Sequence, residues 1–351
     1  EIPLRLVGSE MCIRDRHIVE ALMKVNIRDV AKHAGVSIAT VSHVLNNSQH
    51  VTEPTRQRVL SSVSALNYSP NTTAKSFKSG KRNIIGCIIP DISNYFWALA
   101  VDEIETTLAA HGYNLLITNT KELPDKEISD IKLLSSGVVD GIIVGSTLSD
   151  WSVMDAYNYS DIPIVFVDRE PKNCTYDKVL ISNYTSMYNG VSNLIKKGNR
   201  RIGYIAGLSR LSTTIERIDA FRESMSNHGI TVSDSLIKYG DSMCNSAIQP
   251  ALELIEDNCT AIVISNNIMA ADVISYLFQH RKELSRRIDI LGYQEGLRDV
   301  YVLQPSGVIT QPTVEMGRLA ARQMLKRLEA KKSPIQTIKL NSLLTLYDNS
   351  Y

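Results

Sequence analysis

The segment 27–46, which reads IRDVAKHAGVSIATVSHVLN, constrains the fold more than any other part of this 351-residue chain. Its first half places apolar residues at helical spacing, namely Ile27, Val30, Ala31 and Ala34. Gly35 follows at the point where the chain must reverse, and glycine takes a positive φ there at no steric cost. A second helical pattern begins directly after Ser37. The segment therefore predicts two short helices joined by a tight glycine turn.

Both predicted helices carry start signals. Asn26 is the expected cap of the first, with Asp29 in a capping-box-like position, and Ser37 is the expected cap of the second. In the second helix we expect three residues to face inward, namely Val41, Val44 and Leu45. The outward positions are Ile38, Ala39, Ser42 and His43. An ordinary helical hairpin is the alternative. The outward face carries no acidic residue, which favours a helix-turn-helix that enters the DNA major groove.

A third helix is expected after Thr52, its predicted cap, with Pro54 in its first turn. Its predicted buried stripe consists of Val59, Leu60, Val63 and Leu66. Three helices of this length close a core of roughly 40 residues, which is small for an independently stable unit. We therefore expect a marginally stable headpiece.

The charge of the chain is concentrated near this headpiece. From Lys24 to Arg82 the sequence holds nine Lys or Arg residues and two acids, whereas the whole chain has a formal net charge of +1. A local excess of positive charge of this size is typical of proteins that contact nucleic-acid phosphates.

Three motifs in this region are specific: VA-x-x-AGVS-x-x-TVS-x-VLN, then V-x-x-x-TR-x-RV, then LNY-x-PN-x-x-AKS. Together with IIGCIIPDISNYF at 84–96, they resemble the LacI/GalR family of bacterial transcription regulators. The resemblance runs from Met23 to about Leu346. It implies an all-α helix-turn-helix DNA-binding headpiece followed by an α/β two-lobed, periplasmic-binding-protein-like effector domain.

The resemblance also implies which headpiece residues contact DNA. Ile38, Ala39 and His43 match positions that face base edges, and the family more often has Arg where this chain has His43. Ile38 and Ala39 can make only apolar contacts, for example with thymine methyl groups, so phosphates should supply much of the affinity. The expected phosphate or backbone partners are Ser37, Thr40, Ser42, Asn46, Tyr68 and Asn71.

A short connector, NTTAKSF at 71–77, follows the headpiece. It is too short to be a stable helix alone, because helix nucleation is costly. The resemblance implies a hinge helix, including Ala74 and Lys75, that forms on operator DNA. Phe77 stands where the family usually has a leucine that wedges into the minor groove, and an apolar side chain of this kind can kink a duplex. The alternative is that Phe77 packs against the body.

The remaining chain alternates short β-branched runs with helical stretches, which predicts a parallel α/β fold. The expected strands are 84–89, 114–118, 141–144, 164–167, 201–206, 261–265 and 288–293, and the expected helices include 96–110, 186–197, 214–227 and 269–279. We expect domains at 23–70, 71–82 (hinge and linker) and 83–346, then a tail at 347–351. The resemblance implies one lobe near 83–181 plus 312–340 and another near 182–311. Residues 1–22 lie outside the family pattern, and we interpret them as foreign sequence.

Ligands of open α/β sheets lie beyond the carboxyl ends of the strands. By family position, Tyr95 and Phe96 should wall the cleft, while Asp168, Thr213, Arg217, Asn266 and Gln294 should bind polar groups of an effector. A guanidinium, a carboxylate and amides between aromatic walls suit a sugar. A helix cap or a buried salt bridge is the alternative role for each polar residue. The family commonly has Asp where this chain has Gln294, Asn267 and Ser182, so a sugar phosphate or another unusual effector stays open.

Composition excludes several other classes. The five cysteines form no C-x-x-C pair, which argues against a zinc site and a disulfide scaffold, and we expect no metal and no cofactor. No apolar run is long enough to span a membrane, so we expect a cytoplasmic protein without membrane partners. No leucine heptads follow the body, and a homodimer on a pseudo-palindromic operator is the expected assembly.

The leading prediction is a sequence-specific transcriptional regulator, with repression of carbohydrate-utilisation genes as the expected role. Its operator affinity would be switched by a sugar-like effector in the interlobe cleft. A sugar-binding protein for transport is the alternative. No phosphate-cradle, nucleophile-elbow or zinc-protease motif occurs, so we do not expect an enzyme.

Overall fold

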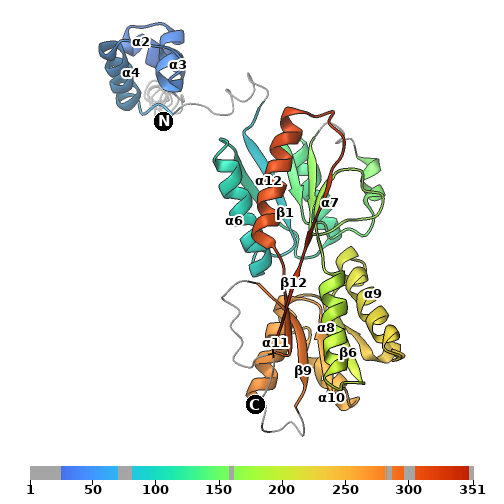
Figure 1. Cartoon of the computed structure of the whole chain (residues 1–351). Coiled ribbons are helices and arrows are strands. Elements are labelled where there is room, and N and C mark those ends of the chain that lie inside the picture. The colour runs from blue at the N-terminus through green and yellow to red at the C-terminus, as the bar shows by residue number, and fades with distance from the viewer. Residues whose placement is uncertain are drawn as a thin grey trace, which may run out of the picture. The chain divides into compact units, whose positions relative to one another are not determined.

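The computed structural model describes residues 25–69, 81–157, 162–280, 282, 287–295 and 305–347. The chain divides into two compact units, Glu1–Gly80 and Lys81–Tyr351, and each is treated by itself (Figure 1). The predicted hinge residues Asn71, Ala74, Lys75 and Phe77 lie outside the described residues, as does the 1–22 leader.

The first unit contains the predicted three helices, α2 (Ile27–Ala34), α3 (Ile38–Asn46) and α4 (Glu53–Ala65). The capping box of α2 is present: Asn26 Oδ1 accepts from the Arg28 amide at 2.8 Å, and Asp29 Oδ2 accepts from the Asn26 amide at 2.9 Å. Gly35 ends α2 in the left-handed region, with φ +63°. These local signals specify the turn, because each satisfies backbone groups that a helix end leaves open.

Two details of α4 differ from expectation. Thr52 occupies the cap position, but its hydroxyl donates to Thr55 Oγ1 at 3.0 Å and caps no backbone amide. Leu60 is 40% exposed and lies outside the core, whereas α4 buries Val59 and Ser62. Ser62 hydrogen-bonds Arg58 O and His33 Nδ1. The buried core of this headpiece consists of Val30, Ala31, Ala34, Val41, Val44 and Val59.

The second unit is built on two six-stranded sheets. The first sheet is entirely parallel and has the order β11-β5-β4-β3-β1-β2, with β1 (Ile84–Ile89), β2 (Asn114–Asn119), β3 (Gly141–Val144), β4 (Ile164–Val167), β5 (Asp177–Ser182) and β11 (Thr337–Asn341). The second sheet has the order β12-β10-β9-β8-β6-β7, with β6 (Ile202–Ala206), β7 (Ile237–Tyr239), β8 (Ala261–Ile264), β9 (Asp289–Gln294), β10 (Gly307–Thr310) and β12 (Leu343–Leu346). Only β12 runs antiparallel to its neighbour in that sheet.

Each sheet with its helices forms one lobe (Figure 1). The first lobe carries α6 (Tyr95–Ala109), α7 (Pro124–Ser135), α12 (Thr313–Glu329) and the 3-10 helix η1 (Trp151–Ala156). The second carries α8 (Tyr184–Lys196), α9 (Ser212–Asn227), α10 (Ile248–Glu256), α11 (Asn267–Gln279) and the 3-10 helix η2 (Asp234–Leu236). The chain crosses between the lobes after β5, after β10 and again between β11 and β12. The last crossing differs from the expectation, in which the returning segment ends near residue 340.

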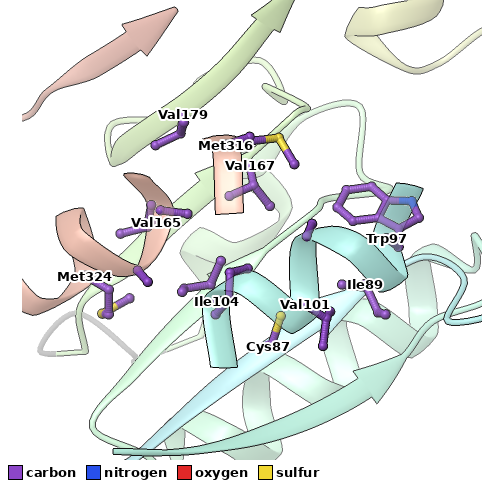
Figure 2. Close-up of a cluster of buried hydrophobic side chains, with 14 of the residues drawn as sticks. Cys87, Ile89, Trp97, Val101, Ile104, Val165, Val167, Val179, Met316 and Met324 are labelled. Carbon is purple, nitrogen blue, oxygen red and sulfur yellow. The ribbon is translucent and has the colours of Figure 1, made fainter. Parts of the chain in front are cut away.

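The core of the first lobe lies between its sheet and the pair α6 and α12. Figure 2 shows Trp97, Val101 and Ile104 of α6 facing the same cluster as Met316 and Met324 of α12. The two helices approach closely at Gly317, where a Cβ would lie only 2.6 Å from Ala100 O. This packing fixes the start of α6, which borders the cleft between the lobes. Across the described residues, no helix combines the length and the apolar character that a membrane span requires.

Candidate nucleic-acid interface and ligand cleft

The helix α3 presents the face that the sequence assigns to DNA. Ile38 is 45% exposed, Ala39 is exposed, and Val41 and Val44 on the opposite face are buried. His43 is half-buried, and its Nδ1 lies 3.0 Å from Ser48 Oγ. The apolar and the outward residues therefore separate as helical spacing predicts.

The polar residues predicted to contact phosphates form local pairs. Ser37 Oγ accepts from the Thr40 amide at 3.1 Å and lies 2.9 Å from Thr40 Oγ1. Asn46 Nδ2 donates to Ser42 O at 2.8 Å. Tyr68 is half-buried and packs against the headpiece core. These contacts fix the side chains along one edge of α3 before any DNA is bound.

A cleft of about 50 Å³ lies between the two lobes. Five predicted effector residues line it together: Phe96, Asp168, Thr213, Arg217 and Asn266. Tyr95 and Gln294 do not line it; Tyr95 is the first residue of α6, and Gln294 ends β9. Asn266 also caps α11, since its Oδ1 accepts from the Met269 amide at 2.8 Å. The alternative role as a helix cap is thus present at Asn266 alongside its position in the cleft.

Asp168 sits in an unusual turn directly after β4. Its φ is +61°, and the Arg169 amide donates to Val167 O at 2.6 Å across it. A non-glycine residue in this region is strained, which is common at functional sites. Burial raises the pKa of the Asp168 carboxyl above its ordinary value, although Arg169 and Arg217 oppose the rise. Asp168 Oδ1 is buried and finds no hydrogen-bond partner among the described residues.

Arg217 projects from the first turns of α9 into the same cleft. Its Nη1 donates to Ser265 O at 2.5 Å, and its guanidinium lies 4.3 Å from the centre of the Tyr293 ring. Nε is buried and has no partner within the part of the chain that the structure describes. The side chain is therefore held in place, yet one donor stays available.

A buried ion pair that the sequence analysis did not single out borders the cleft. Arg169 donates to both carboxylate oxygens of Glu122, at 2.7 and 2.8 Å, and its guanidinium carbon lies 5.6 Å from the centre of the Trp97 ring. Burial would raise the pKa of Glu122, but Arg169 outweighs that effect and holds the pKa below its ordinary value. This pair joins the loops after β2 and β4.

Polar links connect the lobes around the cleft. Arg210, which precedes α9, donates to Glu122 O at 2.6 Å and to Thr147 O and Thr147 Oγ1 at 3.1 and 3.0 Å. Asn267 Nδ2 donates to Asn94 Oδ1 at 3.0 Å. The Glu170 amide donates to Ser212 Oγ, also at 3.0 Å. The lobes are therefore closed on each other through hydrogen bonds of the chain itself.

The sequence analysis did not predict several residues that line the cleft. Ser242 and Met243 follow the short strand β7, and Gln311 follows β10. Neither strand was expected. Recognising those strands would have placed both loops at the carboxyl edge of the second sheet. Across the described residues, no group of three or more His, Cys, Asp or Glu side chains could hold a metal ion.

Comparison with known proteins gives two family matches. Residues 26–71 match the lacI family of bacterial regulatory proteins, and residues 82–340 match the periplasmic binding proteins and sugar binding domain of the LacI family. The transcriptional repressor PurR of Photobacterium profundum is 32% identical over 323 residues, which cover 91% of this chain and 97% of the relative.

Solved structures share the fold. The lac repressor dimer bound to operator and the anti-inducer ONPF has a TM-score of 0.77 at 21% identity, and covers 92% of this chain and 97% of its own. A CelR–cellobiose complex has a TM-score of 0.65 at 23% identity, over 92% and 98% of the two chains. The match at residues 26–71 distinguishes this chain from a sugar-binding transport protein, which would have the two-lobed domain without a DNA-binding headpiece. The chain belongs to the LacI family and is a DNA-binding transcriptional repressor, not an enzyme.

Proposed function

We propose that the protein binds a pseudo-palindromic operator as a homodimer in the cytoplasm, and that a small polar molecule in the interlobe cleft switches its operator affinity. The observation that carries the switch is a group of buried, unpartnered polar atoms on residues that line the cleft, namely Asp168 Oδ1, Arg169 Nε, Arg217 Nε and Gln311 Nε2. Leaving such atoms unsatisfied costs free energy, so a ligand that bonds them stabilises the lobe arrangement that surrounds it.

In the operator complex, Ile38, Ala39 and His43 face base edges. His43 Nδ1 is engaged with Ser48, so Nε2 is the nitrogen that reads a base. Phosphate contacts come from Ser37, Thr40, Ser42, Asn46, Tyr68 and Asn71. In the hinge, Ala74 and Lys75 form a helix on DNA and Phe77 enters the minor groove.

In the cleft, Phe96 supplies an apolar wall, and Asp168, Thr213, Arg217 and Asn266 supply polar groups. A sugar fits this combination, in keeping with a role in carbohydrate utilisation. The closed cleft of about 50 Å³ has room for only a few water molecules. Ligand entry therefore requires the lobes to part, and this movement is the change that can be transmitted to the headpieces.

The DNA part of the proposal is tested by fluorescence anisotropy with a labelled duplex selected from a random pool, across a series of salt concentrations. The logarithm of the association constant should fall linearly with the logarithm of salt, by about 0.9 for each phosphate contacted. A matched duplex with scrambled half-sites is the control. Equal affinity for both duplexes, or a slope near zero, would overturn the proposal.

A further inference from the structure

The loop that follows β3, at 146–148, is held from two sides. On one side, the buried Glu127 of α7 accepts from Ser146 Oγ at 2.6 Å and from the Thr147 amide at 2.5 Å. On the other side, Arg210 of the second lobe donates to Thr147 O and Thr147 Oγ1 at 3.1 and 3.0 Å. Thr147 therefore connects a buried carboxyl group of the first lobe to a cation of the second lobe.

A directed chain of hydrogen bonds runs through this loop from Arg210 to Glu127. Arg210 Nε donates to Thr147 O. The same peptide unit carries the Leu148 amide, which donates to Ser146 Oγ at 3.1 Å. Ser146 Oγ in turn donates to Glu127 Oε1. Every bond in this chain points from the cation toward the carboxyl group, so each bond polarises the next one.

A parallel chain starts at Arg169 and stays inside the first lobe. Arg169 Nη1 donates to Ser146 O at 3.4 Å. The peptide unit of that carbonyl carries the Thr147 amide, which donates to Glu127 Oε2. The two oxygens of Glu127 thus end two chains, and of these the chain from Arg210 requires the lobes to be closed.

The strands that pack against α7 bring no charge to Glu127. β1 and β3 contribute apolar side chains, among them Ile88 and Val144, and neither strand contains an acid or a base. Cys87 is the one titratable residue of these strands, and it packs in the other cluster, with α6 and α12. The charges that act on Glu127 therefore come from α7 itself and from neighbouring loops.

The ionisation of Glu127 responds to these surroundings. Burial raises the pKa of Glu127 to about 7, although its bonds to the loop and the charge of Arg169 oppose the rise. Arg169 itself is paired with Glu122. On α7, the buried Asp130 pairs with Lys126. Both the ionised and the protonated form of Glu127 are therefore accessible near neutral pH.

The proton determines whether the chain from Arg210 is complete. An ionised Glu127 accepts from Ser146, as the chain requires. When Glu127 is protonated, the proton lies on Oε1, because the Thr147 amide opposite Oε2 can only donate. Ser146 Oγ must then accept from both Glu127 and the Leu148 amide, so the last bond of the chain is reversed. Arg210 should therefore dock more firmly on the loop when Glu127 is ionised.

From this geometry we infer that Glu127 is a positioning residue for lobe closure: its carboxylate anchors the loop on which Arg210 docks, and its protonation loosens the closed arrangement. The inference goes beyond the proposed ligand switch, because it concerns closure of the protein without a ligand. It also differs from global unfolding, which exposes Glu127 to water and so favours its ionised form.

The sign of the pH dependence follows from the chain. Closure brings the Arg210 cation to the chain and favours the carboxylate, so the pKa of Glu127 is lower in the closed than in the open arrangement. This contribution to closure is fully present above the pKa of the open arrangement. It is lost as pH falls through about 7, the pKa in the closed arrangement.

Amide hydrogen exchange of the full chain, without ligand or DNA, tests the inference. Exchange rates at about pH 6 and about pH 8.5 are divided by the intrinsic rates at the same pH to give protection. The readout is protection of two second-lobe segments that bond to the first lobe, 208–213 and 265–269. A role of Glu127 confined to the structure of the first lobe would leave these segments unchanged. We expect about tenfold higher protection at the higher pH, because hydrogen bonds to charged groups are stronger than neutral ones.

Variants test the role of the carboxyl group. Glu127→Gln keeps an acceptor for the Thr147 amide but is neutral, so protection should stay at the low-pH level at both pH values. Ser146→Ala removes the middle of the chain and should have the same effect, which keeps the test available if Glu127→Gln does not fold. Asp130→Asn changes a buried carboxyl group of the same helix that pairs with Lys126, and as the matched control it should keep the wild-type response.

Arg210→Met tests the other end of the chain. Its protection should be low at both pH values, and adding Glu127→Gln should change it less than twofold. A wild-type protein without the pH response, or a response that persists in Glu127→Gln or in Arg210→Met, would overturn the inference. Loss of the response in Asp130→Asn would contradict its assignment to Glu127.

Discussion

The guanidinium of Arg210 donates to both the carbonyl and the hydroxyl oxygen of Thr147, at 3.1 and 3.0 Å, and so joins the second lobe to the loop that follows β3 of the first. All three oxygens that accept from Arg210 belong to carbonyl or hydroxyl groups. When the lobes part, water can donate a hydrogen bond to each of these oxygens in place of Arg210. Such a link is stable only while the lobes are closed, which makes it a suitable part of a reversible switch.

Arg210→Met should loosen the closed arrangement in the absence of ligand. Loss of these hydrogen bonds costs roughly 1–3 kcal/mol, so amide hydrogen exchange in peptides covering 119–123 and 145–149 should become about tenfold faster. Arg222→Met is the control, because Arg222 pairs with Asp234 at the surface of the second lobe alone. Exchange that stays at the wild-type rate in Arg210→Met would show that this residue does not hold the lobes.

The pair Glu122–Arg169 should be strongly coupled. Removing one partner leaves a buried charge, so Glu122→Gln and Arg169→Met should each lower the free energy of unfolding by about 3–5 kcal/mol. The double variant should lose clearly less free energy of unfolding than the sum of the losses in the two single variants. A double-mutant cycle measured by urea unfolding tests this. Lys238→Met, which breaks the more exposed pair with Glu253, should cost under about 1 kcal/mol. Additive losses at Glu122 and Arg169 would contradict the pairing.

Glu127 should make stability depend on pH. It is fully buried on α7, accepts from Ser146 Oγ at 2.6 Å and from the Thr147 amide at 2.5 Å, and burial raises its pKa to about 7. Because the folded pKa lies above the unfolded one, this group stabilises the fold below the unfolded pKa, and that contribution is lost as pH rises through about 7.

The contribution of Glu127 amounts to about 3 kcal/mol in total, at about 1.36 kcal/mol for each pKa unit. The wild-type protein should lose this stability between about pH 5 and pH 8, and Glu127→Gln should not show that loss. Urea unfolding at several pH values measures both. If Glu127→Gln keeps the wild-type pH profile, the carboxyl is already ionised at about pH 5 and the assignment is wrong.

His43→Ala should change specificity more than affinity. A side chain that reads a base edge contributes about 1–3 kcal/mol of discrimination between bases. The variant protein should therefore bind operators that differ only at the base pair contacted by His43 with equal affinity. Thr40→Val, at a position proposed to contact phosphate, should weaken all duplexes by a similar factor. The measurement is anisotropy with a set of operator variants. Equal weakening of all duplexes by His43→Ala would mean that His43 reads no base.

Sequence interpretation succeeds where the signal is local. The strands β3 and β4 begin and end at the expected residues, because each is a short apolar run between turns. The caps at Asn26 and Ser37 and the turn at Gly35 are likewise determined by neighbouring residues.

Sequence interpretation fails where contacts between distant parts of the chain determine the structure. The strands β11 and β12 are only partly buried at the edges of the two sheets, and their short sequences, TIKLN and LLTL, gain strand structure by pairing with β5 and β10. Glu122 and Arg169 lie 47 residues apart in two loops, and no pattern in the sequence predicts that they form an ion pair. Leu60 looks like a core residue, but its side chain is 40% exposed, because α4 turns the face that holds Val59 and Ser62 toward the core.

The central claim, that the arrangement of the lobes sets operator affinity, can be tested without knowing the ligand. Asn94 and Asn267 touch across the cleft at 3.0 Å, so Asn94→Cys and Asn267→Cys can be joined by a short bis-thiol-reactive linker in a Cys244→Ser background, since Cys244 is exposed. Each variant that carries only one of the two introduced cysteines, treated in the same way, is the control. We predict that operator affinity, measured by anisotropy, changes at least tenfold between the linked and unlinked forms; equal affinities in a fully linked sample would contradict the account.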